Sequence, residues 1–245
     1  MAVIPAHASE LLDTAREHWS RPGATSLSGK PIRTLEATPQ HTVNPYWDLA
    51  LTLPLHERRL PVPGSGMLVE ALPPPHGPFG WWVLQRRFAW ALPSPGDLTW
   101  LLAQLAGRPV LDVGAGLGYW AWQLSQLGVD VLATDIASTD TWLDEVEPFH
   151  PVAHHPADPA EHPERALLLS WPPSGGLAVD SLRSYTGDTV VYLGELNPEV
   201  CGGADFFAEL EENWTLLGHS PWHVNLYGCR GVLRAYRRPP DVRLW

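Results

Sequence analysis

The sequence is poor in lysine and cysteine and has no long apolar run. Lys30 is the only lysine, the 16 Lys and Arg residues face 27 Asp and Glu, and the formal net charge is −11. Clustered cations supply most of the non-specific affinity for nucleic acid. This charge balance therefore disfavours a nucleic-acid substrate, although a local arginine patch can oppose the net charge.

Two cysteines, Cys201 and Cys229, are too few for a disulfide scaffold, and neither has a partner at zinc-ligand spacing. We expect free thiols and no metal site. The longest apolar runs fall short of a membrane span, and the N-terminus lacks the charged start and apolar core of a signal peptide. A cytoplasmic protein with no membrane partner is the expectation. A hydrophobic fraction of 44% is typical of a globular chain.

From about residue 81 onward, short apolar segments alternate with amphipathic segments. The expected strands are Val110–Val113, Val129–Thr134, Phe149–Ala153, Ala166–Ser170 and Thr189–Leu193, and the expected helices are Asp97–Ala106, Leu117–Leu127 and Ala204–Trp214. Extended segments at Trp214–His219 and Gly231–Tyr236 follow. This order predicts an α/β fold, Rossmann-like and doubly wound, with a mostly parallel sheet and an antiparallel C-terminal edge pair.

The first 90 residues have a different character. A helix is expected over Ser9–Trp19, but residues 31–80 are rich in Pro, Gly and Trp and show few periodic stretches. We expect residues 1–90 to form an extension or lid packed on the core, and residues 91–245 to form the Rossmann-like domain. Most of the 13 tryptophans are expected in the core and cover, and several in the N-terminal half are candidates for lining an aromatic substrate pocket.

The most informative stretch runs from Val110 to Gly118 and reads VLDVGAGLG. An apolar strand leads into glycines at alternate positions and then into a helix. Glycine lets the backbone turn sharply and approach a ligand closely, and the helix start offers free N–H groups. About 20 residues on, the next strand ends at Asp135, where an acid is placed to bind ribose hydroxyls.

These residues resemble the first two cofactor motifs of class I S-adenosylmethionine-dependent methyltransferases. The resemblance covers residues 97–215 and implies S-adenosyl-L-methionine as cofactor. It implies that Asp112 orients the methionine ammonium, that Gly114, Gly116 and Gly118 admit the cofactor, and that Asp135 holds the ribose. The predicted cofactor site also includes Ala115, Ile136 and Ser170.

A dinucleotide oxidoreductase is the rival interpretation, because residues 116–121 also fit G-x-G-x-x-A. Two features count against it. The Asp112 carboxylate would repel a pyrophosphate, and Tyr119 and Trp120 are bulky beside one. A tight glycine turn without a ligand is the remaining alternative.

The fourth expected strand ends in Ser170-Trp171-Pro172-Pro173. This resembles the Asp/Asn/Ser-Pro-Pro-aromatic turn of amino-methyltransferases, but Trp171 stands at the acceptor position unless Ser170 takes that role. Trp171 is the first candidate catalytic residue, as a stacking platform, and the alternative is a lid over the core. Glu195, after the fifth strand, is the second candidate as a general base, and the alternative is a solvated acid.

The chain also resembles a group of uncharacterised bacterial methyltransferase-like proteins, through residues 44–47 (Asn-Pro-Tyr-Trp), residues 88–90 (Phe-Ala-Trp) and the Trp-Pro-Pro turn. Residues 44–47 are interpreted as a turn that packs two aromatics over the cofactor. A circularly permuted enzyme is the alternative. The function expected from these residues is methyl transfer to a small-molecule or metabolite acceptor. The alternatives are a nucleic-acid amino-methyltransferase and a cofactor-binding protein without methyl transfer.

Overall fold

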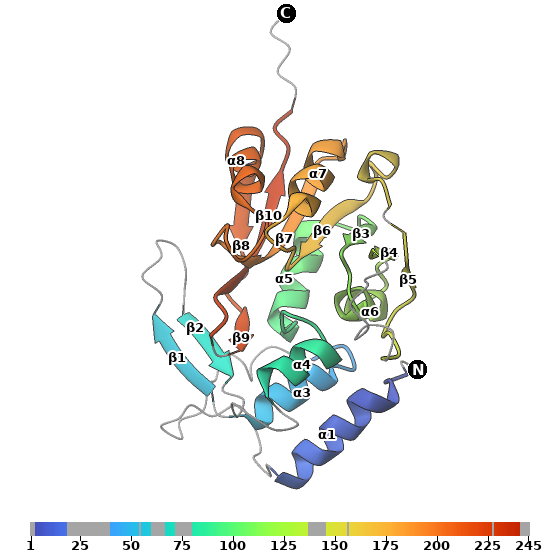
Figure 1. Cartoon of the computed structure of the whole chain (residues 1–245), viewed down its shortest axis with the longest axis vertical. Coiled ribbons are helices and arrows are strands. Elements are labelled where there is room, and N and C mark those ends of the chain that lie inside the picture. Colours follow the sequence, from blue (N-terminus) through green and yellow to red (C-terminus); the bar gives the residue numbers. More distant parts are fainter. Residues whose placement is uncertain are drawn as a thin grey trace, which may run out of the picture.

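A seven-stranded sheet forms the centre of the molecule, with strand order β5-β4-β3-β6-β7-β10-β8 (Figure 1). The computed structural model describes residues 3–18, 40–53, 55–59, 67–71, 80–136, 146–155, 157–226 and 228–240. The strands of the large sheet are β3 (Val110–Val113), β4 (Val131–Thr134), β5 (Val152–Ala153), β6 (Ala166–Ser170), β7 (Thr189–Glu195), β8 (Thr215–His219) and β10 (Gly231–Arg237).

The pairing within this sheet confirms the predicted fold class. Strands β5, β4, β3, β6 and β7 run parallel to their neighbours. Strand β10 pairs antiparallel with both β7 and β8, so the C-terminal edge pair is also as predicted. Numbered from β3, the order is 3-2-1-4-5-7-6, whereas the dinucleotide-binding Rossmann sheet has 3-2-1-4-5-6. The first strand of the sheet is the one that carries the glycine loop.

Helices cover both faces of the large sheet. They are α5 (Pro95–Leu105), α6 (Tyr119–Gln126), α7 (Gly176–Ser184) and α8 (Ala204–Asn213), with a short 3-10 turn, η1 (Pro159–Glu161). Strand β6 shows the division: Leu168 packs in the cluster that contains α5 and α6 residues, while Leu167 and Leu169 pack in the cluster that contains α7 and α8 residues. Period-2 alternation of a buried strand between two helical layers explains its continuous apolar sequence.

The N-terminal segment forms a second cluster of elements. Its helices are α1 (Ala6–His18), α3 (Pro45–Thr52) and α4 (Trp81–Arg87). Strands β1 (Leu55–Arg59) and β2 (Met67–Ala71) join β9 (Val224–Leu226) in a three-stranded sheet. Strands β1 and β2 lie within residues 31–80, where periodic stretches are few. Strand β2 pairs in parallel with β9, a partner that lies more than 150 positions away in sequence. The N-terminal helix starts at Ala6, earlier than expected, and Trp19 lies outside the described residues.

Asn44 links the N-terminal segment to the large domain. Its side-chain oxygen accepts hydrogen bonds from Trp47 N (3.1 Å) and from the Tyr119 hydroxyl (2.8 Å), and its amide donates to the Pro93 carbonyl (2.8 Å). Tyr46 stacks on Phe88 with ring centroids 4.7 Å apart. Residues 44–47 therefore form a helix start that packs two aromatic side chains into a buried cluster, and the sheet order is not that of a permuted chain. That these aromatics cover the cofactor stays a prediction.

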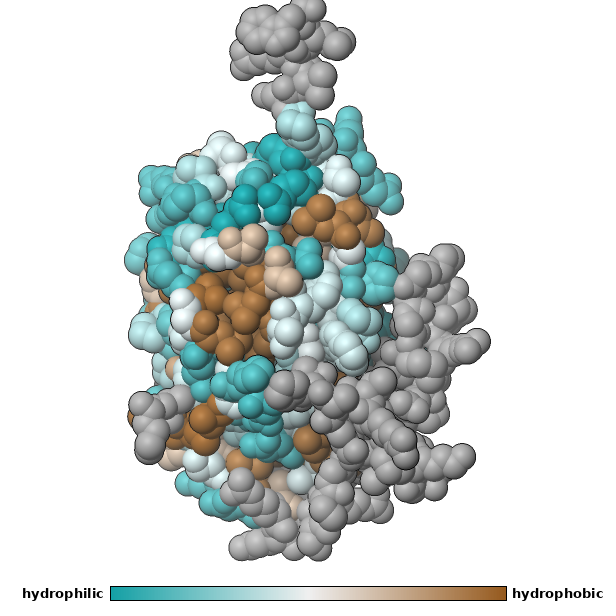
Figure 2. All heavy atoms as spheres, turned by 180° about the vertical axis from the view of Figure 1, so that it is seen from behind, coloured by the Kyte–Doolittle hydropathy of each residue, from teal (hydrophilic) through white to brown (hydrophobic). Residues whose placement is uncertain are grey.

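The surface of the described residues is mixed. Figure 2 shows hydrophilic side chains over much of one face, interrupted by apolar patches. Exposed apolar side chains include Leu216 and Leu217 on the edge strand β8 and Trp82 and Trp90 near α4. Within the described residues, no helix is both long and apolar enough to cross a membrane.

Candidate functional site

The glycine loop after β3 adopts a conformation that requires glycine. Gly114, Gly116 and Gly118 have φ angles of +78°, +57° and +68°, in the left-handed region that side chains disfavour. The N–H groups of Gly114 and Ala115 donate to the Thr134 carbonyl at 2.9 and 3.0 Å, which ties the loop to the end of β4. A Cβ at Gly116 would meet no atom within 4 Å. The loop thus leaves open space beside the backbone at this position.

Asp112 is the most unusual polar group of the site. It is 1% exposed, and neither carboxylate oxygen has a hydrogen-bond partner among the described residues. Burial, reinforced by the negative charge of Asp135, raises the pKa of Asp112 to about 7. A buried carboxylate without a donor is costly, so this position is suited to a positively charged or hydrogen-bond-donating ligand.

Asp135 lies at the other side of the same loop. Its Oδ2 accepts a hydrogen bond from Gly116 N at 2.6 Å. Burial raises the pKa of Asp135, and hydrogen bonds from Gly116 and Ile136 oppose that shift. The contact joins the second acid directly to the loop, although Asp135 does not line the pocket described below. The neighbouring Ile136 side chain is exposed.

Gly118 has a different role from the other two glycines. A Cβ there would lie 3.0 Å from His150 Cβ and 3.1 Å from Val152 Cγ2. Gly118 therefore allows the start of α6 to pack against the segment before β5, and it does not line the pocket.

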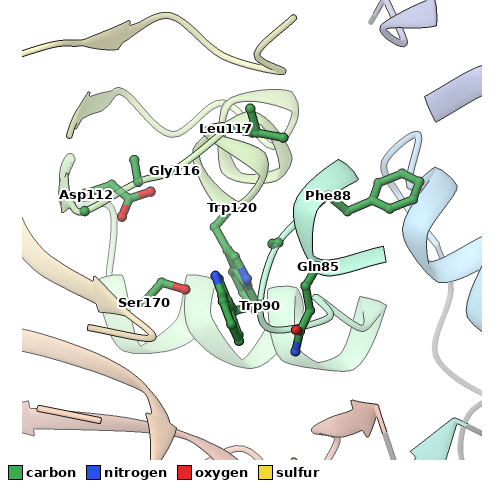
Figure 3. A pocket seen from close by; sticks show the side chains of 11 residues that line it. Gln85, Phe88, Trp90, Asp112, Gly116, Leu117, Trp120 and Ser170 are labelled. Atoms are coloured by element: carbon green, nitrogen blue, oxygen red, sulfur yellow. The ribbon is translucent and has the colours of Figure 1, made fainter. Parts of the chain in front are cut away.

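A partly open pocket lies beside the loop (Figure 3). It brings residues of the N-terminal segment together with five of the predicted cofactor residues: Asp112, Gly114, Ala115, Gly116 and Ser170. Its lining residues are Gln85, Phe88, Ala89, Trp90, Asp112, Gly114, Ala115, Gly116, Leu117, Trp120 and Ser170.

The wall opposite the glycine loop comes from residues 85–90. The sequence singles out Phe88-Ala89-Trp90 as a stretch shared with similar proteins, and Trp90 as one of several tryptophans that are candidates for an aromatic substrate pocket, but it does not place them beside the glycine loop. Trp120, which the sequence marks only by its bulk, donates its indole N–H to the Ala91 carbonyl at 3.0 Å and so anchors this wall.

At the end of β6, the structure brings Ser170 to the pocket, whereas Trp171 does not line it. Trp171 has φ +53°, which is unusual for a residue other than glycine, and its N–H donates to the Leu193 carbonyl at 2.6 Å. Its ring stacks on Trp90, with centroids 6.3 Å apart and an interplanar angle of 18°. Trp171 thus supports a residue that lines the pocket.

The remaining candidates lie outside the pocket. Glu195 Oε1 accepts a hydrogen bond from Arg230 N at 2.9 Å. Cys201, expected to be a free thiol, is free and buried, and burial raises its pKa. Across the described ranges, no three His, Cys, Asp or Glu side chains gather as a metal site.

No protein-family model and no curated protein sequence matches the chain. Solved structures with a similar fold include a magnesium protoporphyrin IX methyltransferase from Synechocystis PCC 6803, at 12% identity over 58% of this chain and 76% of that one, with a TM-score of 0.38. A TehB-like SAM-dependent methyltransferase from Corynebacterium glutamicum is 18% identical over 59% and 88%, with a TM-score of 0.38. A ribosomal-protein methylase from Lactobacillus delbrueckii is 18% identical over 58% and 77%, with a TM-score of 0.36.

These similar structures are methyltransferases whose names point to different acceptors. With TM-scores of 0.36–0.38 and identities of 12–18%, the function of this chain has to be inferred from its own pocket. Membership of a bacterial group with a Trp-Pro-Pro turn stays a prediction.

Proposed function

We propose that this chain binds S-adenosylmethionine in the pocket between the glycine loop and Trp90 and acts as a methyltransferase on a small-molecule acceptor. The observation that carries the proposal is the buried, unpartnered carboxylate of Asp112 beside the loop. The ammonium of the cofactor's methionine part, placed there, would satisfy both carboxylate oxygens with charge-assisted hydrogen bonds.

The other residues of the loop suit the same ligand. Gly116 faces open space, so the backbone can be approached closely, and a Cβ at Gly114 would have only Leu177 within 4 Å. Asp135, held on Gly116 N, is the group proposed to accept hydrogen bonds from ribose hydroxyls. Gly118 is proposed to act indirectly, through the position of α6.

A dinucleotide cofactor fits less well. A pyrophosphate at the loop would lie against the Asp112 carboxylate, and like charges at short range in a buried site are strongly unfavourable. The strand order also differs, since β10 is inserted between β7 and β8.

When bound, the cofactor supplies a methyl group already activated by a positively charged sulfur. The residues of this chain then have mainly to bind, align and exclude water. Trp90, Trp120 and Phe88 provide an apolar wall for this purpose. Catalytic roles for Trp171 and Glu195, and cytoplasmic localisation, stay predictions.

The test is titration calorimetry with S-adenosylhomocysteine, the demethylated product, and with NAD. The wild type is expected to bind S-adenosylhomocysteine and not NAD. Asp135→Ala is expected to weaken binding about tenfold or more, equivalent to about 1.4 kcal/mol for a lost charge-assisted hydrogen bond. Glu211→Ala, an exposed carboxylate on α8, serves as the matched control and should bind like the wild type. Binding of NAD in place of S-adenosylhomocysteine would overturn the proposal.

A further inference from the structure

The pocket wall opposite the glycine loop carries an indole that the described residues leave partly uncovered. Trp90 lines the pocket next to Ser170, yet its side chain is 38% exposed, and Figure 3 shows it between Ser170 and Gln85. Large aromatic side chains contribute most when both faces are covered. A partly exposed tryptophan that lines a pocket together with Asp112 and Ser170 is therefore a candidate surface for a ligand ring.

Two other tryptophans hold this ring in place. Trp171 stacks on one side of Trp90 at 6.3 Å, and Trp82 meets it edge-on at 6.3 Å with an interplanar angle of 76°. Trp171 is in turn fixed by its left-handed backbone conformation and by Gly231, where a Cβ would come within 2.8 Å of its ring. The Trp90 ring is thus supported by packing on one face and at its edge before any ligand arrives, which reduces the entropy lost on binding.

A buried polar group lies in the same wall. Gln85 is 2% exposed and lines the pocket, and its Oε1 has no hydrogen-bond partner among the described residues. Its Nε2 donates to Cys229 Sγ at 3.7 Å, which holds the amide. A buried carbonyl oxygen without a donor is unfavourable, and a ligand that brings an O–H or N–H group would satisfy it.

We infer that the methyl acceptor is a flat aromatic molecule with a hydroxyl or amine substituent, which stacks on Trp90 and donates a hydrogen bond to Gln85 Oε1. This inference rests on the proposed function, because it places the acceptor beside the cofactor end of the pocket. Asp112 and the glycines serve the cofactor, whereas Trp90 and Gln85 serve the acceptor.

Probes that differ in one property each can test the inference. Phenol and naphthol are flat and carry a hydroxyl, cyclohexanol and decahydronaphthol keep the hydroxyl but lose the aromatic face, and methoxynaphthalene keeps the ring but cannot donate. Each is titrated by calorimetry into the protein saturated with S-adenosylhomocysteine. Naphthol is expected to bind about tenfold more tightly than either decahydronaphthol or methoxynaphthalene.

Variants then assign the contacts. Trp90→Ala is expected to weaken naphthol binding about tenfold, and Trp90→Phe, which keeps an aromatic face, to restore most of it. Gln85→Met is expected to reduce the affinity for naphthol to the affinity that the wild type has for methoxynaphthalene. Trp100→Ala, a half-buried tryptophan on α5 that does not line the pocket, is the matched control.

Three results would overturn the inference: no binding of either flat phenol, equal binding of the saturated alcohols, or unchanged naphthol affinity in Trp90→Ala. A parallel and equal loss of S-adenosylhomocysteine affinity in Trp90→Ala would also overturn it, by assigning Trp90 to the cofactor. Failure of the wild type to bind S-adenosylhomocysteine is a different result, and it removes the proposed function itself. The same probe series on the ligand-free protein then still decides whether Trp90 and Gln85 recognise a flat donor.

Discussion

At the scale of single residues, substitutions at Gly116 and Gly128 distinguish an effect on backbone conformation from an effect on ligand binding. Gly116 (φ +57°) and Gly128 (φ +82°) both have left-handed backbones, and a Cβ at either would meet nothing within 4 Å. Alanine at each should therefore cost a similar roughly 1 kcal/mol of stability. Of the two, only Gly116 lines the pocket.

We expect Gly116→Ala to weaken S-adenosylhomocysteine binding by at least about tenfold, since the methyl group fills space meant for the ligand, and Gly128→Ala to leave it unchanged. Calorimetry measures the affinities, and urea denaturation measures the stabilities. Equal affinities in the two variants would contradict a ligand at Gly116.

Asp112 makes stability depend on pH in a direction opposite to that of most carboxylates. Its pKa in the folded chain is about 7, against 3.8 for an ordinary aspartate. Between about pH 4 and about pH 7 the unfolded chain loses this proton and the folded chain keeps it, so stability falls as the pH rises, by at most about 1.4 kcal/mol per pH unit. Below and above this window the contribution is constant.

Asp112→Asn removes the titrating group and should become progressively more stable than the wild type as the pH rises through this window. Above about pH 7 the difference in free energy of unfolding should level off. Urea denaturation of both proteins across the range measures that difference. If the difference in free energy of unfolding does not vary between about pH 4 and about pH 7, Asp112 is ionised in the folded chain across that range, which contradicts its raised pKa.

The cofactor half of the site is predictable from single residues, and the other half is not. Asp112, Gly114, Ala115 and Gly116 are close in sequence, so one strand and one turn bring them to the pocket. Gln85 and Trp90 reach the same pocket only through the tertiary packing of α4 and the residues that follow it. The sequence marks Trp90 only as one of several candidate tryptophans, and it does not mark Gln85.

At the scale of secondary structure elements, α5 is bound to a distant segment through its N-terminus. Ser94 and Asp97 form a capping box. Asp97 is 0% exposed and also contacts His223 Nδ1 at 2.8 Å and accepts from Ser220 Oγ at 2.5 Å. One carboxylate thus joins the helix start to the chain between β8 and β9.

Asp97→Ala leaves buried polar groups without their partner and is expected to cost roughly 3–5 kcal/mol of stability. Thr99→Ala, at an exposed position on the same helix, should change stability by less than about 0.5 kcal/mol. Urea denaturation of the two variants gives both values. A loss below about 1 kcal/mol for Asp97→Ala would mean that this network is not a stabilising link.

An element can be predicted from the sequence when its own residues carry a clear apolar pattern, and not when it depends on contacts with residues that are distant in sequence. The parallel strands β6 and β7 have mostly apolar sequences, because they are buried on both faces of the sheet. Helix α7 (Gly176–Ser184) was missed, since it begins with glycines and carries only a narrow apolar face. Strand β9 has three residues, too few for a periodic signal.

At the scale of the whole molecule, the charge balance disfavours a polyanionic partner. With a net charge of −11, we expect no binding of single-stranded RNA or duplex DNA tighter than about 10⁻⁴ M at about 0.1 M salt. Fluorescence anisotropy of labelled oligonucleotides, with and without S-adenosylhomocysteine, measures this. Tighter binding that weakens steeply with salt would instead favour the nucleic-acid methyltransferase alternative.

The two sheets show how the N-terminal segment is joined to the rest. Strand β2 pairs with β9, which lies between two strands of the large sheet in sequence. Residues 1–90 and 91–245 therefore share hydrogen-bonded structure. We propose that the first segment acts as a lid on the core, and the presence of residues 85–90 in the pocket wall supports this proposal.

The most direct test of the central claim is a crystal structure of the protein grown with S-adenosylhomocysteine. We predict that the ligand's ammonium lies within hydrogen-bond distance of Asp112. We also predict that the ligand contacts the backbone of Gly116 and that its ribose hydroxyls donate hydrogen bonds to Asp135. Ligand density at another place, or an Asp112 carboxylate that still has no partner in the complex, would contradict the account.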